Sequence, residues 1–145
     1  MVIIMQEKEV VLKLYHNVYM GIIGIESITD KIKERPLLKI ILAQKSEYEN
    51  LKNELLNLCE EYHVLNKDIS PLAKVSSEMM SKMKLMGDNS SSHVAKMMME
   101  GTNKGLIELE KINNNYTGTD EKLKKLISEI IKVEEQNNED LKGFL

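Results

Sequence analysis

The chain has 145 residues, enough for one domain with its own core, and a formal net charge of −3 from 20 basic and 23 acidic residues. Two prolines, seven glycines and no tryptophan favour long helices over sheet, so we expect an all-α protein. The mixed charges leave no basic block for a nucleic acid, and the apolar run before Gln6 is too short for a secretory or membrane segment. The expected location is therefore the cytoplasm.

Hydrophobic periodicity predicts two helices in the first half of the chain. The first should run from about Gln6 to Lys33, because apolar residues recur there at alternating steps of four and three. Pro36 suits the first position of a second helix, which the same spacing extends to about His63. The predicted inward positions are Val11, Tyr15, Val18, Ile22, Ile25, Thr29 and Ile32, then Leu37, Ile41, Gln44, Tyr48, Leu51, Leu55, Leu58 and Tyr62.

Capping residues divide the second half in the same way. A short helix is predicted from Pro71 to about Met86, a third bundle helix over about 91–112, and a polar loop over 113–118. Thr119 and Asp120 offer N-cap chemistry for a last helix that ends near Gly143. We therefore expect a single domain over 1–145, with a first hairpin at about 6–63, a crossover at about 64–90 and a second hairpin at about 91–145.

The two predicted hairpins repeat each other. The segment from Val18 to Ile28 is similar to Thr102 to Ile112, and Leu37 to Leu55 is similar to Ile127 to Leu145. This repeat predicts a four-helix bundle. It places Gly21 and Gly105 at equivalent helix-interior sites, where we expect close backbone approach between the first and third helices. It also transfers the inward positions to the last helix as Ile127, Ile131, Glu134, Asn138, Leu141 and Leu145.

Several short motifs, taken in order, resemble a bacterial ferritin-like family of unknown function. They are the segment from Tyr19 to Glu26, the stretch from Gln44 to Leu51, the polar break before Ser92-His93, and Met99-Glu100-Gly101 leading to Gly105. The match covers most of the chain. The resemblance implies a ferritin-like four-helix bundle with a helical crossover. It implies no particular activity, since the family carries none that is established.

A di-iron centre in such a bundle needs a Glu from each of two helices and a Glu-x-x-His pair from each of the other two. The chain lacks that set, because the sole Glu-x-x-His motif runs from Glu60 to His63 at a helix end. We therefore predict no metal site and no cofactor. The alternative is iron or another transition metal in a divergent, incomplete di-metal site drawn from Glu47, Tyr48, His93, Glu100 and Glu134.

Polar residues stand at the centre of the predicted bundle. Gln44 and Tyr48 of the first hairpin correspond to Glu134 and Asn138 of the second. We interpret them as a buried hydrogen-bond layer that fixes helix register, with a degenerate metal site as the alternative. A buried Glu134 without a cation should have a raised pKa, because desolvation penalises the charged form.

Methionines are concentrated at 79, 80, 83 and 86 and again at 97 to 99. Their flexible side chains suit core packing against the crossover or an adaptable protein-binding surface. An empty methionine-lined pocket would instead favour the binding of a small apolar ligand.

The functional expectation rests on missing motifs. There is no nucleophile–base arrangement, no phosphate-binding glycine loop and no complete metal set, so we expect a non-enzymatic bundle for protein interaction or self-association. A metal-binding or oxidoreductase bundle is the alternative. Leu14, Tyr19 and Leu38, just off the inward positions, favour a homodimer or a partner protein over a monomer.

Overall fold

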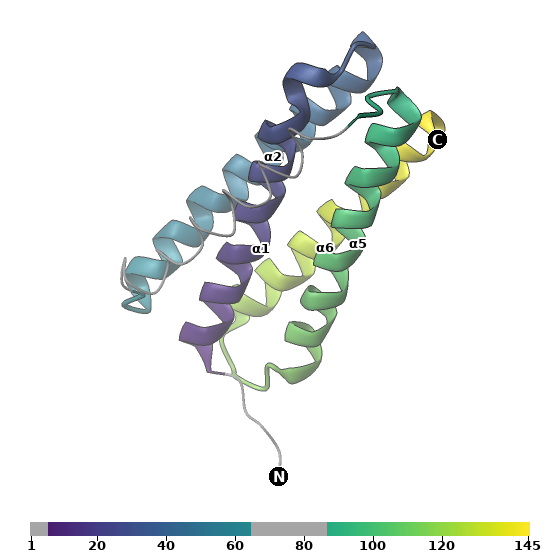
Figure 1. Cartoon of the computed structure of the whole chain (residues 1–145). Coiled ribbons are helices and arrows are strands. Elements are labelled where there is room, and N and C mark those ends of the chain that lie inside the picture. Colours follow the sequence, from purple (N-terminus) through teal and green to yellow (C-terminus); the bar gives the residue numbers. More distant parts are fainter. Residues whose placement is uncertain (1–5, 65–86) are drawn as a thin grey trace.

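The computed structural model describes residues 6–64 and 87–145. This part of the chain is all-helical and contains no strand, as the composition predicts (Figure 1). The short helix predicted from Pro71 to Met86 lies outside the described residues. The helices are α1 (Glu7–Ile28), η1 (Thr29–Lys31), α2 (Arg35–Glu61), α5 (Ser91–Asn115), α6 (Glu121–Leu141) and η2 (Lys142–Phe144).

The four long helices of the described part pack side by side. α1 contacts α2 and α5, and α6 contacts α5 and α2, so that α1 and α6 lie on one diagonal. α2 and α5 run in the same direction, opposite to α1 and α6 (Figure 1). Residues 64 and 87 therefore lie toward opposite ends of the bundle. None of the helices within 6–64 and 87–145 is long and apolar enough to cross a membrane.

Capping hydrogen bonds explain where two of the helices begin. Ser90 Oγ accepts from the His93 backbone N–H at 3.3 Å at the start of α5. Asp120 Oδ1 accepts from the N–H groups of Lys122 and Leu123, at 3.0 and 3.2 Å, at the start of α6. Asp120, one of the two residues proposed to cap the last helix, is therefore its N-cap.

α1 ends earlier than predicted because hydroxyl groups compete for its last carbonyls. Ser27 Oγ donates to the Gly24 carbonyl and Thr29 Oγ1 to the Ile25 carbonyl, each at 2.6 Å. The chain then tightens into η1. α5 instead continues through Asn115, into the stretch that composition predicts to be a loop.

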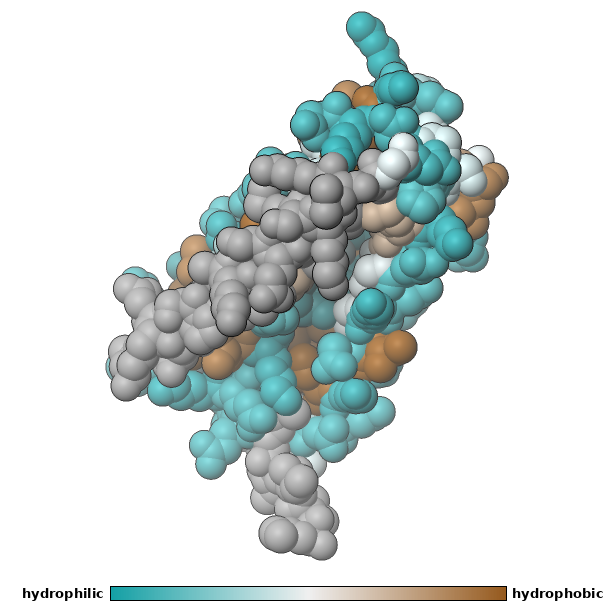
Figure 2. Space-filling view, viewed as in Figure 1, coloured by the Kyte–Doolittle hydropathy of each residue, from teal (hydrophilic) through white to brown (hydrophobic). Residues whose placement is uncertain are grey.

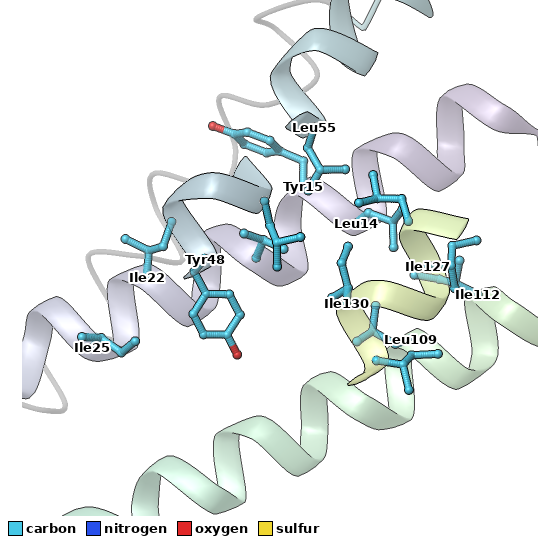
Figure 3. Packing of buried hydrophobic residues seen from close by; sticks show 14 of the residues in the cluster. Leu14, Tyr15, Ile22, Ile25, Tyr48, Leu55, Leu109, Ile112, Ile127 and Ile130 are labelled. Atoms are coloured by element: carbon cyan, nitrogen blue, oxygen red, sulfur yellow. The ribbon is translucent and has the colours of Figure 1, made fainter. Parts of the chain in front are cut away.

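The inward positions predicted for α1 and α2 form the core. They are buried from Val11 to Ile25 and from Leu37 to Leu55, and Figure 3 shows part of this cluster. Cys59 is buried beside them, and burial raises the pKa of its thiol. Leu14, expected near a dimer contact, is fully buried and cannot contact a partner.

Two inward positions transferred to the last helix are wrong. Asn137, and not Asn138, is buried at 2% exposure, because the inward face of α6 steps by three residues after Glu134 where α2 steps by four after Gln44. Leu145 is 62% exposed, because α6 gives way to η2 and the helical spacing is lost.

The described surface on the face shown in Figure 2 is mainly hydrophilic. On the face shown in Figure 2, hydrophobic areas are separated by hydrophilic ones. The homodimer stays a prediction. The exposed large hydrophobic residues of the described ranges are Leu42, Leu56, Ile107 and Leu145.

Candidate functional site

A cavity of about 610 Å³ lies between α1 and α5, midway along the bundle. Small-molecule sites typically have volumes of about 300–1,000 Å³. Gln44 and Tyr48 from α2 and Glu134 from α6 form its buried polar floor. Its walls are Lys13, His16, Asn17, Met20, Gly21 and Gly24 from α1 and Met97, Met98, Glu100, Gly101, Thr102, Lys104, Gly105, Glu108 and Ile112 from α5.

Glycines keep this level of the bundle open. A Cβ atom at Gly21 would lie 2.9 Å from Tyr48 Cζ, and one at Gly105 would lie 2.6 Å from Glu134 Oε1. A Cβ at Gly101 would meet no atom of the described residues within 4 Å. The expectation of close backbone approach is therefore wrong, because these positions accommodate side chains of α2 and α6 and the cavity itself.

Glu134 is the most unusual residue of the floor. Its side chain is 2% exposed, and its buried Oε2 atom has no hydrogen-bond partner among residues 6–64 and 87–145. Burial raises the pKa of Glu134 to about 8, since the charged form loses its solvation, as the sequence predicts. The carboxyl group is therefore mainly protonated at pH 7. An unpartnered buried polar atom costs free energy.

Asn17 brings a second unpartnered acceptor to the cavity. Its Nδ2 atom donates to the Gly105 carbonyl at 3.0 Å, which ties α1 to α5 and fixes the orientation of the amide. The remaining atom, Asn17 Oδ1, is buried and has no hydrogen-bond partner in the described part of the chain. Sequence reasoning missed Asn17, because its role depends on the position of α5 opposite it.

The polar layer predicted from the sequence is present, with Asn137 in the place predicted for Asn138. Gln44 Nε2 donates to the Asn137 carbonyl at 3.3 Å and so joins α2 to α6. Burial, and then the Glu134 carboxylate, raise the pKa of Tyr48 above its ordinary value. In Figure 3 the Tyr48 hydroxyl is directed toward the side on which α5 lies. Asn138 is outside the layer and donates to Asn103 Oδ1 at 2.7 Å.

Charges of both signs stand at the mouth of the cavity. Lys13 and Lys104 are balanced by Glu100 and Glu108, and all four side chains are exposed. His16 is half-buried beside them, and burial lowers its pKa while Glu108 opposes that shift. Sequence reasoning assigned no role to His16, although His16, Met20 and Gly24 follow one another at steps of four on one helix face.

The five weak metal candidates do not converge on one point. Tyr48, Glu100 and Glu134 line the cavity, whereas Glu47 is exposed on α2 and His93 stands at the start of α5, outside it. Within residues 6–64 and 87–145, no three His, Cys, Asp or Glu side chains could hold a metal ion together.

The methionine cluster contributes to the site only in part. Met97 and Met98 line the cavity together with Met20, while Met99 packs against the core from another side of α5. Met79, Met80, Met83 and Met86 lie outside the described residues. Scans against family models, curated proteins and solved structures find no match to the chain, so its function must be argued from the chemistry of this cavity.

Proposed function

We propose that the bundle is a non-enzymatic binding protein for a small, largely apolar molecule. The observation that carries this proposal is the cavity of about 610 Å³ between α1 and α5. Its volume matches a small organic ligand, and an apolar lining with a few convergent polar groups is typical of such sites. Binding there would remove water from a surface that α1, α2, α5 and α6 leave uncovered.

The side chains of the walls support an apolar ligand body. Met20, Met97 and Met98 present flexible, polarisable thioethers, and Ile112 closes one part of the wall. Methionine adapts to ligands of irregular shape at little cost, because its side chain is unbranched. The polar floor supplies orientation at the opposite side, through Glu134 and Tyr48.

The helix directions support a ferritin-like bundle as the fold proposal. α2 and α5 run in parallel, so residues 64 and 87 lie toward opposite ends of the bundle, and ferritin-like folds have one long connection of this kind. Protein interaction and self-association stay predictions. So does a divergent metal site, which near-stoichiometric iron, manganese or copper in untagged protein would favour.

The test is nuclear magnetic resonance of protein labelled with ¹³C in its methionine methyl groups, titrated with 1-octanol. We expect the signals of Met20, Met97 and Met98 to shift together and saturably, while that of Met99 serves as an internal reference. Unchanged signals at all three cavity methionines would contradict the proposal.

A cavity-filling variant makes the test specific. Gly101→Phe places an aromatic ring at a wall position where a Cβ meets no atom of the described helices within 4 Å. The fold should therefore tolerate the change, while ligand binding is lost. Gly143→Phe is the matched control, since a Cβ there is equally free and the residue lies outside the cavity. Equal octanol binding by both variants would count against this cavity.

A further inference from the structure

We infer that the ligand of this cavity is a single unbranched chain of about twelve carbons or more, extended along the bundle axis between α1 and α5. The inference rests on the proposed function and specifies its ligand class, a long single-chain amphiphile such as a fatty alcohol. It follows from the shape of the cavity, which the register of α1 against α5 sets.

One hydrogen bond fixes which parts of α1 and α5 lie at the same level. Asn17 Nδ2 of α1 donates to the Gly105 carbonyl of α5 at 3.0 Å, and the two helices run in opposite directions (Figure 1). From this level the lining of α1 continues to Gly24, on the side on which the lining of α5 reaches Met97. In the other direction the lining of α5 reaches Ile112. Met97 and Ile112 therefore stand at opposite ends of the lining that the described helices provide.

The cavity is long and narrow. Its lining on α1 extends from Lys13 to Gly24, which corresponds to roughly 16 Å along the axis at about 1.5 Å of rise per residue. The lining on α5, from Met97 to Ile112, corresponds to roughly 22 Å. A volume of about 610 Å³ spread over the shorter length leaves a mean cross-section of roughly 40 Å², which is about 7 Å across. The cavity is therefore roughly twice as long as it is wide, or more.

An extended hydrocarbon chain has these proportions. With carbon–carbon single bonds of about 1.5 Å in a zigzag, it advances roughly 1.25 Å per carbon, so that about twelve carbons span roughly 15 Å. The two ends of the cavity suit such a chain, because Met97 and Met98 provide apolar surface at one end and Ile112 provides it at the other.

The polar floor lies between these apolar ends. The Tyr48 ring is the group nearest to a Cβ position at Gly21, and the Glu134 carboxyl group is the one nearest to a Cβ position at Gly105. Both glycines lie within one helical turn of the level that the Asn17–Gly105 hydrogen bond defines. A compact ligand would contact this floor and one apolar end, whereas an extended chain covers both ends.

The first experiment compares 1-dodecanol with cyclododecanol in the methionine-methyl titration. The two alcohols have the same number of carbons and one hydroxyl group each, but only 1-dodecanol can extend. We expect 1-dodecanol to bind about tenfold or more tightly, because a ligand that leaves one end of the cavity empty keeps about two or more methylene groups from apolar surroundings. Equal affinities, or tighter binding of cyclododecanol, would overturn the inference.

Chain length gives a second readout. In the series of straight-chain alcohols from hexanol to dodecanol, the affinity should rise about tenfold for every two carbons added, without a limit inside the series. A compact site would instead fill at an intermediate length. An affinity that stops rising at octanol would contradict an extended chain.

Isoleucine methyl labelling added to the methionine labelling reports on both ends of the cavity at once. One equivalent of 1-dodecanol should shift the signals of Met97 and Ile112 together, because one molecule reaches both. Ile107 is the matched reference on the same helix, since it is exposed and lies outside the cavity lining. A shift at only one of the two ends would show that the ligand does not extend along the axis.

The outcomes separate this inference from the proposed function. If octanol shifts the cavity methionines but 1-dodecanol has no advantage over cyclododecanol, the inference is wrong and the proposed function stands. If no alcohol shifts these signals, both fall.

Discussion

Replacing Glu134 with glutamine should stabilise the protein, and the gain should grow with pH. Glutamine has nearly the same shape but does not ionise. In the folded wild type, burial raises the pKa of Glu134 from an ordinary value of 4.5 to about 8. Because the folded-state pKa is the higher one, this group contributes fully to stability below pH 4.5, and that contribution is lost as the pH rises toward 8.

The size of the effect follows from the interval between the two pKa values. Each pH unit within it lowers the free energy of unfolding by about 1.4 kcal/mol. The wild type therefore loses about 3 kcal/mol by pH 7 and about 5 kcal/mol above pH 9, and Glu134→Gln avoids this loss. At pH 5 the two proteins should differ by less than about 1 kcal/mol from this source.

Urea denaturation followed by far-ultraviolet circular dichroism at pH 5, 7 and 9 measures the difference. Glu135→Gln is the control, since Glu135 is exposed on the same helix. Every titrating group other than Glu134 is common to the wild type and Glu134→Gln, so these groups cancel in the comparison of the two. A stability difference that does not vary with pH, or a wild type that is more stable than Glu134→Gln at pH 9, would refute the reasoning.

Two further predictions concern backbone positions. Gly21→Ala should lower the melting temperature, because its Cβ would meet the Tyr48 ring at 2.9 Å. Gly101→Ala should raise stability by about 0.5–1 kcal/mol, since no atom within 6–64 and 87–145 lies within 4 Å of its Cβ. Thermal melts of the pair check this, and changes of the same sign would contradict it. Asp120→Ala should lower the free energy of unfolding, measured by urea denaturation, by about 1 kcal/mol, because it removes the N-cap of α6. Thr119→Ala, at an exposed position, is the control. Equal losses in the two variants would show that the cap contributes nothing.

Hydrophobic periodicity predicted those features of the fold that are set within a single helix, namely which of its faces is buried. The inward faces of α1 and α2 were readable because apolar residues recur at steps that match the helical turn. Gln44 and Tyr48 were found as polar members of that face. The sequence analysis chose Asn138 where Asn137 is buried. It assumed that equivalent residues of the two hairpins face the core, but α6 is rotated about its axis relative to α2 at this point.

The cavity was not predictable in the same way, because it depends on the distance between helices. Gly21 and Gly105 were recognised as equivalent positions, yet periodicity does not tell whether a glycine admits a backbone, a side chain or empty space. Asn17 is next to the inward position Val18 in the sequence, and asparagine is a residue type usually found on the surface. Only the position of α5 gives its amide a carbonyl to bind.

The glycine-lined and methionine-lined parts of the cavity wall differ in flexibility. Where Gly21, Gly101 and Gly105 line the cavity, the wall is formed by the main chain of α1 and α5, which helical hydrogen bonds hold in place. This part of the wall cannot change shape by a change of side-chain rotamer. The methionine thioethers are the opposite case, with several rotatable bonds each. A ligand would therefore contact rigid main chain at the glycines and flexible side chains at the methionines. Such a cavity discriminates strictly where the guest lies against glycine and accepts chains of varying thickness where it lies against methionine.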